Sequence, residues 1–254
     1  MTDRQTHSTV TAALVVIGEE ILSGRTCDEN IAYIAAYLTR IGIGLREVRV
    51  VPDVEADIVA AVNALRPRYT YVFTTGGIGP THDDVTTDAI AKAFQVEVVV
   101  DAEAVAAMRQ RFSGAELTPA RLRMARVPKG AELIDNAISR APGFVIGNVI
   151  VLAGVPRIMQ VMLDAVSPRL AKGRPMLARS VRLDVPEGDA APGLAELQAA
   201  HPEVQIGSYP FFENKRLGTY VVLRSVEADK LEAAIAALWI LIAKEGFQAA
   251  AEDK

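Results

Sequence analysis

The residues best suited to chemistry lie in one glycine-rich segment, Thr74–Asp88, with the sequence TTGGIGPTHDDVTTD. Its three glycines, Gly76, Gly77 and Gly79, permit positive φ angles and let the backbone approach a ligand closely. The amides of such a loop can form a nest for an anion, and the start of a following helix adds positive potential. The pattern alone leaves two interpretations open, a phosphate cradle and a plain tight turn.

Two carboxylates and a histidine follow the glycines directly, as His82, Asp83 and Asp84. Bare carboxylates repel a phosphate, and a divalent cation removes this conflict because it bridges both kinds of oxygen. We therefore expect Asp83 and Asp84 to be catalytic ligands of Mg²⁺, Mn²⁺ or Co²⁺. Hydrolysis at such a metal site would also need a general base to take a proton from water, and His82 or Glu20 could serve. The alternative is that the two aspartates merely cap the helix that starts near Thr86.

The first loop of the chain carries a second acidic pair, Glu19 and Glu20, ahead of residues 23–25 (SGR). Arg25 has the planar donor fork that phosphate binding favours. Asn30 is suited either to bond the edge of a ligand or to cap the following helix. By itself this segment is more typical of an exposed surface turn.

Two later loops also combine glycine with a cation. Residues 153–157 (AGVPR) join a strand to a helix, so Gly154 lets the backbone approach a ligand and Arg157 adds a positive charge. Residues 139–143 (SRAPG) offer Arg140 as a phosphate contact. Taken alone, residues 153–157 are better interpreted as a simple strand-to-helix turn.

Strands and helices alternate along the first part of the chain, and they position these loops. Short apolar runs rich in β-branched residues predict buried strands, and apolar residues at helical spacing predict helices between them. Such alternation predicts a mostly parallel sheet with helices on both faces and ligands at the carboxyl ends of its strands. The expected strands are residues 10–17, 45–51, 69–74 and 96–100, with a hairpin over 144–152. The expected helices are one capped by Asp28 and those at 55–65, 88–94, 102–112 and 156–170.

The order of elements changes after residues 172–175 (KGRP), which are typical of a linker. The β-α-β-β-α order that follows predicts a small α+β sandwich with a mixed sheet. We therefore expect two domains, residues 1–172 and 173–254. The expected elements of the second domain are strands at 177–185, 204–208 and 219–226 and helices at 193–200 and 229–244.

Composition narrows the range of partners. The chain has 254 residues, with 27 Lys and Arg against 31 Asp and Glu, so no basic surplus exists to neutralise a nucleic-acid polymer. A single cysteine rules out an intramolecular disulfide and a multi-cysteine zinc site.

The polar N-terminus lacks the pattern of a secretory signal, and the most apolar stretch, Leu231–Ala243, is too short to span a bilayer. We therefore expect a cytoplasmic protein without a membrane partner.

Four ordered motifs resemble one known family. GEEILSGRTCDEN (18–30), TGGIGPTHDDVT (75–86), APGF (141–144) and GNVIVLAGVPRIM (147–159) together resemble the molybdopterin-binding, or molybdenum cofactor biosynthesis, domain. The closer subgroup is the amino-terminal part of competence/damage-inducible protein A, and the front half of eukaryotic FAD synthase is similar. The resemblance covers residues 10–172, and IGSYP (206–210) resembles the smaller domain that trails in the same subgroup.

The resemblance implies a three-layer α/β/α fold, followed by a small C-terminal α+β domain. It also implies a pocket for a pterin or a nucleotide, that is, a small phosphorylated ligand, with molybdopterin as one candidate. Related domains are oligomeric, so a homo-oligomer is expected. The ligand-binding residues to which the matched motifs point are Gly18, Ser23, Gly24, Arg25, Asn30, Thr75, Gly76, Gly77, Gly79, Thr86, Gly154, Pro156 and Arg157.

In the molybdopterin adenylyltransferase branch the corresponding loop ends in Arg-Asp, and here Asp83 stands in place of that arginine. An Asp-Asp loop is typical of the branch associated with divalent-metal hydrolysis of ADP-ribose or FAD-type pyrophosphates. The sequence therefore favours a metal-dependent nucleotide pyrophosphatase. A protein that binds a pterin or nucleotide without turnover is the alternative, and an oligomer with a vestigial pocket is a third hypothesis. Neither a nicotinamide-mononucleotide deamidase domain nor the transferase half of FAD synthase is expected within the 254 residues.

Overall fold

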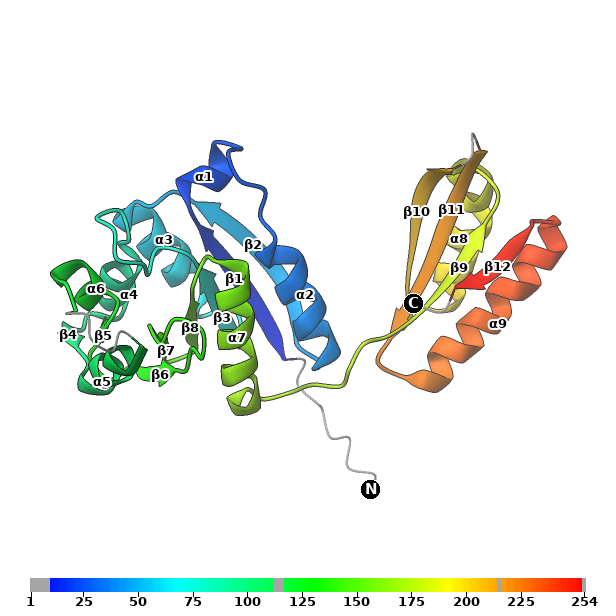
Figure 1. The fold of residues 1–254 in the computed structure, drawn as a ribbon. Coiled ribbons are helices and arrows are strands. Elements are labelled where there is room, and N and C mark those ends of the chain that lie inside the picture. Colours follow the sequence, from blue (N-terminus) through cyan, green and yellow to red (C-terminus); the bar gives the residue numbers. More distant parts are fainter. Residues whose placement is uncertain (1–9, 112–116, 214–215, 253–254) are drawn as a thin grey trace, which may run out of the picture. The chain divides into compact units, whose positions relative to one another are not determined.

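The computed structural model describes residues 10–111, 117–213 and 216–252. The chain divides into two compact units, residues 1–173 and 174–254 (Figure 1). We call them the first and the second unit and describe each by itself.

A six-stranded sheet forms the centre of the first unit. Its strands are β1 (Thr11–Ile17), β2 (Gly44–Val51), β3 (Tyr71–Thr75), β6 (Glu132–Ile134), β7 (Gly143–Ile146) and β8 (Val149–Leu152). They lie in the order β2-β1-β3-β8-β7-β6. The first four in this order are parallel, whereas β7 pairs antiparallel with β8 and β6 pairs antiparallel with β7. The predicted hairpin thus forms and joins the sheet through β8.

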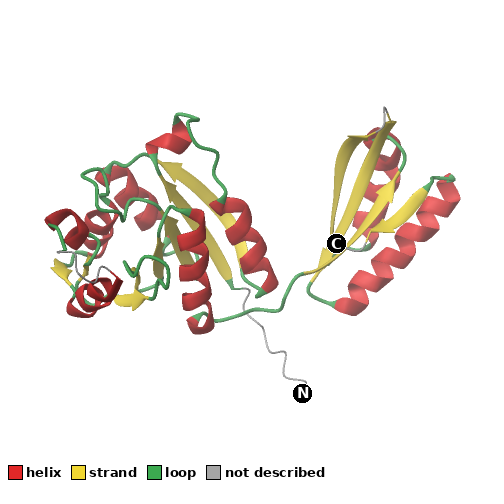
Figure 2. Cartoon of the chain, viewed as in Figure 1, coloured by secondary structure: helices red, strands yellow, loops and turns green. Residues whose placement is uncertain are grey.

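Helices cover both faces of this sheet (Figure 2). They are α2 (Asn30–Arg40) and α7 (Pro156–Val166) on one face and α3 (Glu55–Leu65) and α4 (Thr86–Phe94) on the other. Successive residues of β1 point to opposite faces, so Leu14 packs in the cluster with α2 and α7 while Val15 packs with α3 and α4. The three-layer α/β/α arrangement is therefore confirmed.

Several short elements of the first unit escaped prediction or differ from it. The strand expected at 96–100 pairs with β5 in a separate two-stranded sheet, and the last turn of the helix at 156–170 is a 3₁₀ helix. Phe112, the last residue of another expected helix, lies outside the described residues. The short elements are α1 (Glu19–Leu22), β4 (Val98–Val100), α5 (Ala102–Arg111), α6 (Pro119–Arg123), β5 (Arg126–Pro128) and the 3₁₀ turn Ser167–Arg169.

The second unit is a four-stranded sheet with two helices packed on one face. Its elements are β9 (Leu177–Leu183), α8 (Glu187–Ala200), β10 (Gln205–Glu213), β11 (Arg216–Ser225), α9 (Ala228–Glu245) and β12 (Ala249–Glu252). The β-α-β-β-α-β order and the strand order β10-β11-β9-β12 are those of a ferredoxin-like split βαβ unit. Its core is the side of the sheet on which Val221 and Leu223 of β11 meet the helices.

Two expectations for the second unit are wrong. The sheet is antiparallel in all its ladders rather than mixed, because β11 lies between β9 and β10 and separates the two strands that run the same way. The helix expected at 193–200 begins six residues earlier, at Glu187, and contains Pro192. Ala190 in that added stretch is buried, so tertiary packing outweighs the helix-breaking tendency of the Pro-Gly pair. The final strand, β12, was not expected at all.

None of the helices within the described residues is long and apolar enough to cross a membrane.

Candidate functional site

Three glycine loops meet at the carboxyl edge of the six-stranded sheet, because β1, β3 and β8 are parallel neighbours. Gly18, Gly76 and Gly154 follow these strands. A Cβ added to Gly76 would lie 2.1 Å from the Ile17 carbonyl oxygen, and one added to Gly154 would lie 3.2 Å from the Gly76 Cα. The three loops therefore touch through their backbones, which leaves no room for a side chain at Gly76 and little at Gly154.

The turn after β3 is held by a buried threonine. Gly76 and Gly77 have φ angles of 102° and 67°, which L side chains rarely adopt. The Thr86 hydroxyl donates to the Gly76 carbonyl (2.9 Å), and the Thr86 amide donates to the Gly77 carbonyl (3.0 Å). Thr86 was expected to contact a ligand. Its buried hydroxyl instead fixes the shape of the glycine turn.

Asp84 closes the second half of this loop. Its Oδ1 accepts from the Gly79 amide (2.7 Å), and its Oδ2 accepts from the Thr81 amide (2.8 Å) and from the Thr81 hydroxyl. Helix α4 has Val85 as its N-cap residue and no side-chain cap bond, so neither aspartate caps the helix as the alternative interpretation held. Asp84 thus builds the loop with both of its oxygens.

The glycine turn of this loop keeps two consecutive backbone amides available for a ligand. The Gly76 amide donates to the Leu152 carbonyl (3.2 Å), and the Gly79 amide donates to Asp84. Within the described residues, the amides of Gly77 and Ile78 donate to no acceptor. Of the three glycines expected to cradle a phosphate, only Gly77 has a free amide, and Ile78 provides the second.

Asp83 and His82 lie on the exposed side of the same loop. The side chains are 65% and 99% exposed, and their nearest oxygen and nitrogen lie 4.0 Å apart. A hydrogen bond from Thr81 lowers the pKa of Asp83, and His82 adds to this effect. Asp83 is therefore an ionised carboxylate that solvent or a cation can reach.

Sequence reasoning missed a further acidic residue, Asp53. It follows β2 at the same edge, and its Oδ2 accepts from the Glu19 amide (2.9 Å). Burial raises the pKa of Asp53, and the nearby charges of Glu20, Asp83 and Asp84 raise it further. Three carboxylates from the loops after β1 and β3 thus act electrostatically on Asp53. The rule that ligands bind at the carboxyl ends of parallel strands could have identified Asp53.

Carboxylate oxygens of this kind suit a hard divalent cation, which would relieve their mutual repulsion. Within the described part of the chain, no group of three or more His, Cys, Asp or Glu side chains is placed to hold a metal ion. Mg²⁺ commonly takes only one or two carboxylates and completes its shell with waters and substrate phosphate oxygens. The donor chemistry therefore fits a cation that binds together with a phosphorylated ligand.

Asn30 links the first loop to the third. Its Nδ2 donates to the Gly154 carbonyl (2.8 Å), while its Oδ1 is buried and has no partner. Asp28 performs the capping role, since its Oδ1 accepts from the Ile31 amide (2.7 Å). The Thr75 hydroxyl is also buried without a partner. These two unpaired polar atoms are on residues that the sequence had assigned to the pocket.

The other predicted residues are mostly exposed. Residues 23–25 lie between α1 and α2, and Arg157 lies in the first turn of α7 after Pro156. Within the described residues neither Arg25 nor Arg157 forms an ion pair, whereas Arg140 lies 3.5 Å from Asp135. The structure therefore places Arg25 and Arg157 on connections that leave the same edge of the sheet.

Arg123, at the end of α6, also escaped sequence reasoning. Its Nη2 donates to the Asp84 carbonyl (3.3 Å), although the two residues are 39 positions apart. No sequence pattern links them, because the contact depends on how α6 packs beside the loop.

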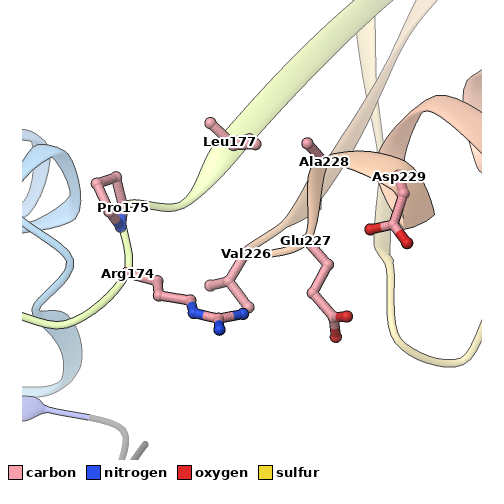
Figure 3. Close-up of a pocket in the computed structure, with 7 residues that line it drawn as sticks. All are labelled: Arg174, Pro175, Leu177, Val226, Glu227, Ala228 and Asp229. Carbon is pink, nitrogen blue, oxygen red and sulfur yellow. The ribbon is translucent and has the colours of Figure 1, made fainter.

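The second unit has a shallow hollow that is separate from the glycine loops of the first unit (Figure 3). It lies at the start of α9 and carries charges of both signs, with Arg174 opposed by Glu227 and Asp229. None of the predicted loop residues lines it. Its full lining is Arg174, Pro175, Leu177, Val226, Glu227, Ala228 and Asp229.

Comparison with known proteins agrees with this architecture. A protein from Pyrobaculum calidifontis is 37% identical over 211 residues, which span 79% of this chain and 80% of that protein. The "Probable FAD synthase" of Caenorhabditis briggsae is 30% identical over 254 residues, which span 90% of this chain but 49% of that protein. This chain thus corresponds to about half of the worm protein.

A solved structure, CinA of unknown function from Thermoplasma acidophilum, is 36% identical and has a TM-score of 0.60. The match covers 64% of this chain and 99% of that one. Residues 175–250 match the family described as "FAD synthase, middle domain". Residues 13–172 match the family described as "Probable molybdopterin binding domain". The chain therefore belongs to the molybdopterin-binding domain family.

Proposed function

We propose that the carboxyl edge of the six-stranded sheet binds the pyrophosphate group of a nucleotide or a pterin nucleotide and hydrolyses it with a divalent cation. The observation that carries this proposal is the pair of consecutive free amides, Gly77 and Ile78, on a loop that also carries Asp83. Free amides bind phosphate oxygens, and an ionised carboxylate beside them calls for a cation.

Different residues would bind the phosphate, hold the cation and accept the proton. Gly77 and Ile78 hold a phosphate through their amides, and the bonds to Thr86 and Asp84 keep that turn in shape before the ligand arrives. Asp83, with Glu20 or Asp53 nearby, would hold the cation. A bound divalent cation lowers the pKa of its water and polarises the phosphorus that is attacked. Glu20 and His82 remain the candidates to take the proton from that water.

One observation favours the second candidate, a protein that binds such a ligand without turnover. Both oxygens of Asp84 already accept hydrogen bonds from the loop, so one of the two residues expected to be metal ligands has a structural task. Asp84→Ala would therefore disturb the loop as well as any metal site. Loss of activity in that variant cannot separate the two candidates, and Asp83 is the better position to change.

The test measures AMP release from ADP-ribose, FAD and NAD with Mg²⁺, Mn²⁺ or Co²⁺. We expect metal-dependent product from the wild type and at least a roughly tenfold lower kcat in Asp83→Asn, since one charged metal contact is lost. Mn²⁺ binding, followed by electron paramagnetic resonance, should weaken in parallel. Glu103→Gln on α5 removes an exposed carboxylate elsewhere and should leave both unchanged.

Tight ligand binding without product under any metal would favour the binding protein. A wild type that neither binds nor hydrolyses a phosphorylated ligand would contradict both candidates.

A further inference from the structure

Two arginines of one short segment have contrasting surroundings. Arg126 forms an ion pair with Asp88 of α4, which joins β5 to that helix. Arg123, three residues earlier, forms no ion pair with any carboxylate of the described residues. Its Nη2 donates to the neutral carbonyl of Asp84, and its Nε is buried without a partner.

Such an arrangement leaves a positive charge without compensation. A partly buried guanidinium is costly unless an anion or several acceptors face it. Thr118 accepts from the Arg121 amide (3.3 Å) at the N-cap of α6, and Pro119 occupies the first turn. The N-terminus of α6 is therefore defined by its own capping, and Arg123, in the last turn of this helix, lies against the loop.

We propose that Arg123 binds a phosphate oxygen of the ligand held by the loop after β3, an inference that rests on the proposed function. The planar fork of a guanidinium matches phosphate geometry, and the bond to the Asp84 carbonyl would orient that fork. The loop itself needs such a cation. Its own charged residues are Asp83 and Asp84, and both repel phosphate.

The test compares two probes with wild-type protein and with Arg123→Gln, using calorimetry in the presence of Mg²⁺. One probe is α,β-methylene ADP, which resists hydrolysis, and the other is adenosine, which lacks phosphate. We expect Arg123→Gln to bind α,β-methylene ADP roughly tenfold to a hundredfold more weakly and adenosine equally well, since a charge-assisted bond is lost. Arg123→Lys should fall between, because it keeps the charge and loses the fork.

Two controls separate charge from loop shape. Arg109→Gln removes an exposed positive charge from α5 and should leave binding of both probes unchanged. Thr81→Val removes the hydroxyl that bonds Asp84 and keeps every charge, so any loss of α,β-methylene ADP affinity should leave the salt dependence of binding as in the wild type, whereas Arg123→Gln should reduce that dependence. The unfolding temperature of each variant checks that the protein remains folded.

Three results would overturn the inference. Equal affinity of Arg123→Gln and wild type for α,β-methylene ADP would show that Arg123 does not contact phosphate, and it would leave the proposed function standing. A weaker affinity of Arg123→Gln for α,β-methylene ADP with the salt dependence of the wild type would show that Arg123 only supports the loop. A wild type that binds α,β-methylene ADP no better than adenosine would overturn the proposed function as well.

Discussion

The loop after β3 and the loop after β1 leave the same edge of the sheet but are held in different ways. In the β3 loop, Asp84 and Thr86 use their side chains to bind loop backbone, and Gly76 touches the Ile17 carbonyl. In the β1 loop, Gly24 has open space around it, and residues 22–27 are exposed. The β3 loop is built before a ligand arrives, whereas residues 23–26 of the β1 loop are held by local backbone hydrogen bonds.

This difference assigns separate tasks to the two loops. A rigid turn with free amides can bind a phosphate without paying a large ordering cost on binding. An exposed loop with Glu20 and Arg25 has room to adjust to the ligand or to a cation. The two loops should therefore respond differently to equivalent substitutions, which can be measured.

The largest expected contrast is between Gly76→Ala and Gly24→Ala. Both glycines have positive φ angles, but only Gly76 would place its new Cβ 2.1 Å from a backbone oxygen. We expect Gly76→Ala to lower the free energy of unfolding by about 3–5 kcal/mol, from strain and overpacking together. Gly24→Ala should cost about 1 kcal/mol, the conformational penalty alone.

Urea unfolding followed by far-ultraviolet circular dichroism measures both changes. Trp239, the single tryptophan of the chain, lies in α9 and reports on the second unit, whose transition should not move. Similar losses in the two variants would contradict the contrast between the loops.

The next contrast lies within the β3 loop, between Asp84→Ala and Asp83→Ala. Removing the Asp84 carboxylate leaves the Gly79 and Thr81 amides without their acceptor, which should cost about 1–3 kcal/mol. Asp83 is exposed, so its removal should change stability little and weaken Mn²⁺ binding instead. The same unfolding experiment and a Mn²⁺ titration distinguish the two roles, and a stable Asp84→Ala would show that Asp84 is not structural.

The smallest effect concerns Asp53, where the loops after β1, β2 and β3 interact. Burial, followed by the charges of Glu20, Asp83 and Asp84, raises the pKa of Asp53 above its usual value. Ionised Asp53 therefore weakens the folded state once the pH exceeds this raised pKa, and the penalty disappears below the pKa of the unfolded chain.

Asp53→Asn keeps an acceptor for the Glu19 amide and removes the charge. We expect its unfolding temperature to be higher than that of the wild type at neutral pH by about 1–2 °C for a domain of this size. The difference should vanish near pH 3, where wild-type Asp53 is protonated in both states. A difference that persists unchanged at acidic pH would show that charge is not its cause.

Local patterns in the sequence were sufficient for the layered fold and for the edge of the sheet at which the glycine loops lie. The strand expected at 10–17 spans Thr11–Ile17, and the helix expected at 55–65 spans Glu55–Leu65. These signals are strong because a buried strand must be apolar along its length and an amphipathic helix must repeat its apolar face. The β12 strand (Ala249–Glu252) gave no such signal, because its alanines are typical of helices and only pairing with β9 makes them a strand.

The sequence alone thus determined the alternating strands, the glycine loops and the edge where they lie, since periodicity and glycine content are local properties. Only the tertiary structure decided which polar groups have hydrogen-bond partners within the protein and which remain available to a ligand. Asp84 is adjacent to Asp83 in the chain, yet one builds the loop and the other is exposed. Asp53, which follows β2, accepts from the Glu19 amide of the loop after β1, and Arg123 of α6 donates to the Asp84 carbonyl of the loop after β3. Hydrogen bonds and charges act through space, so their partners are known only when the chain is folded.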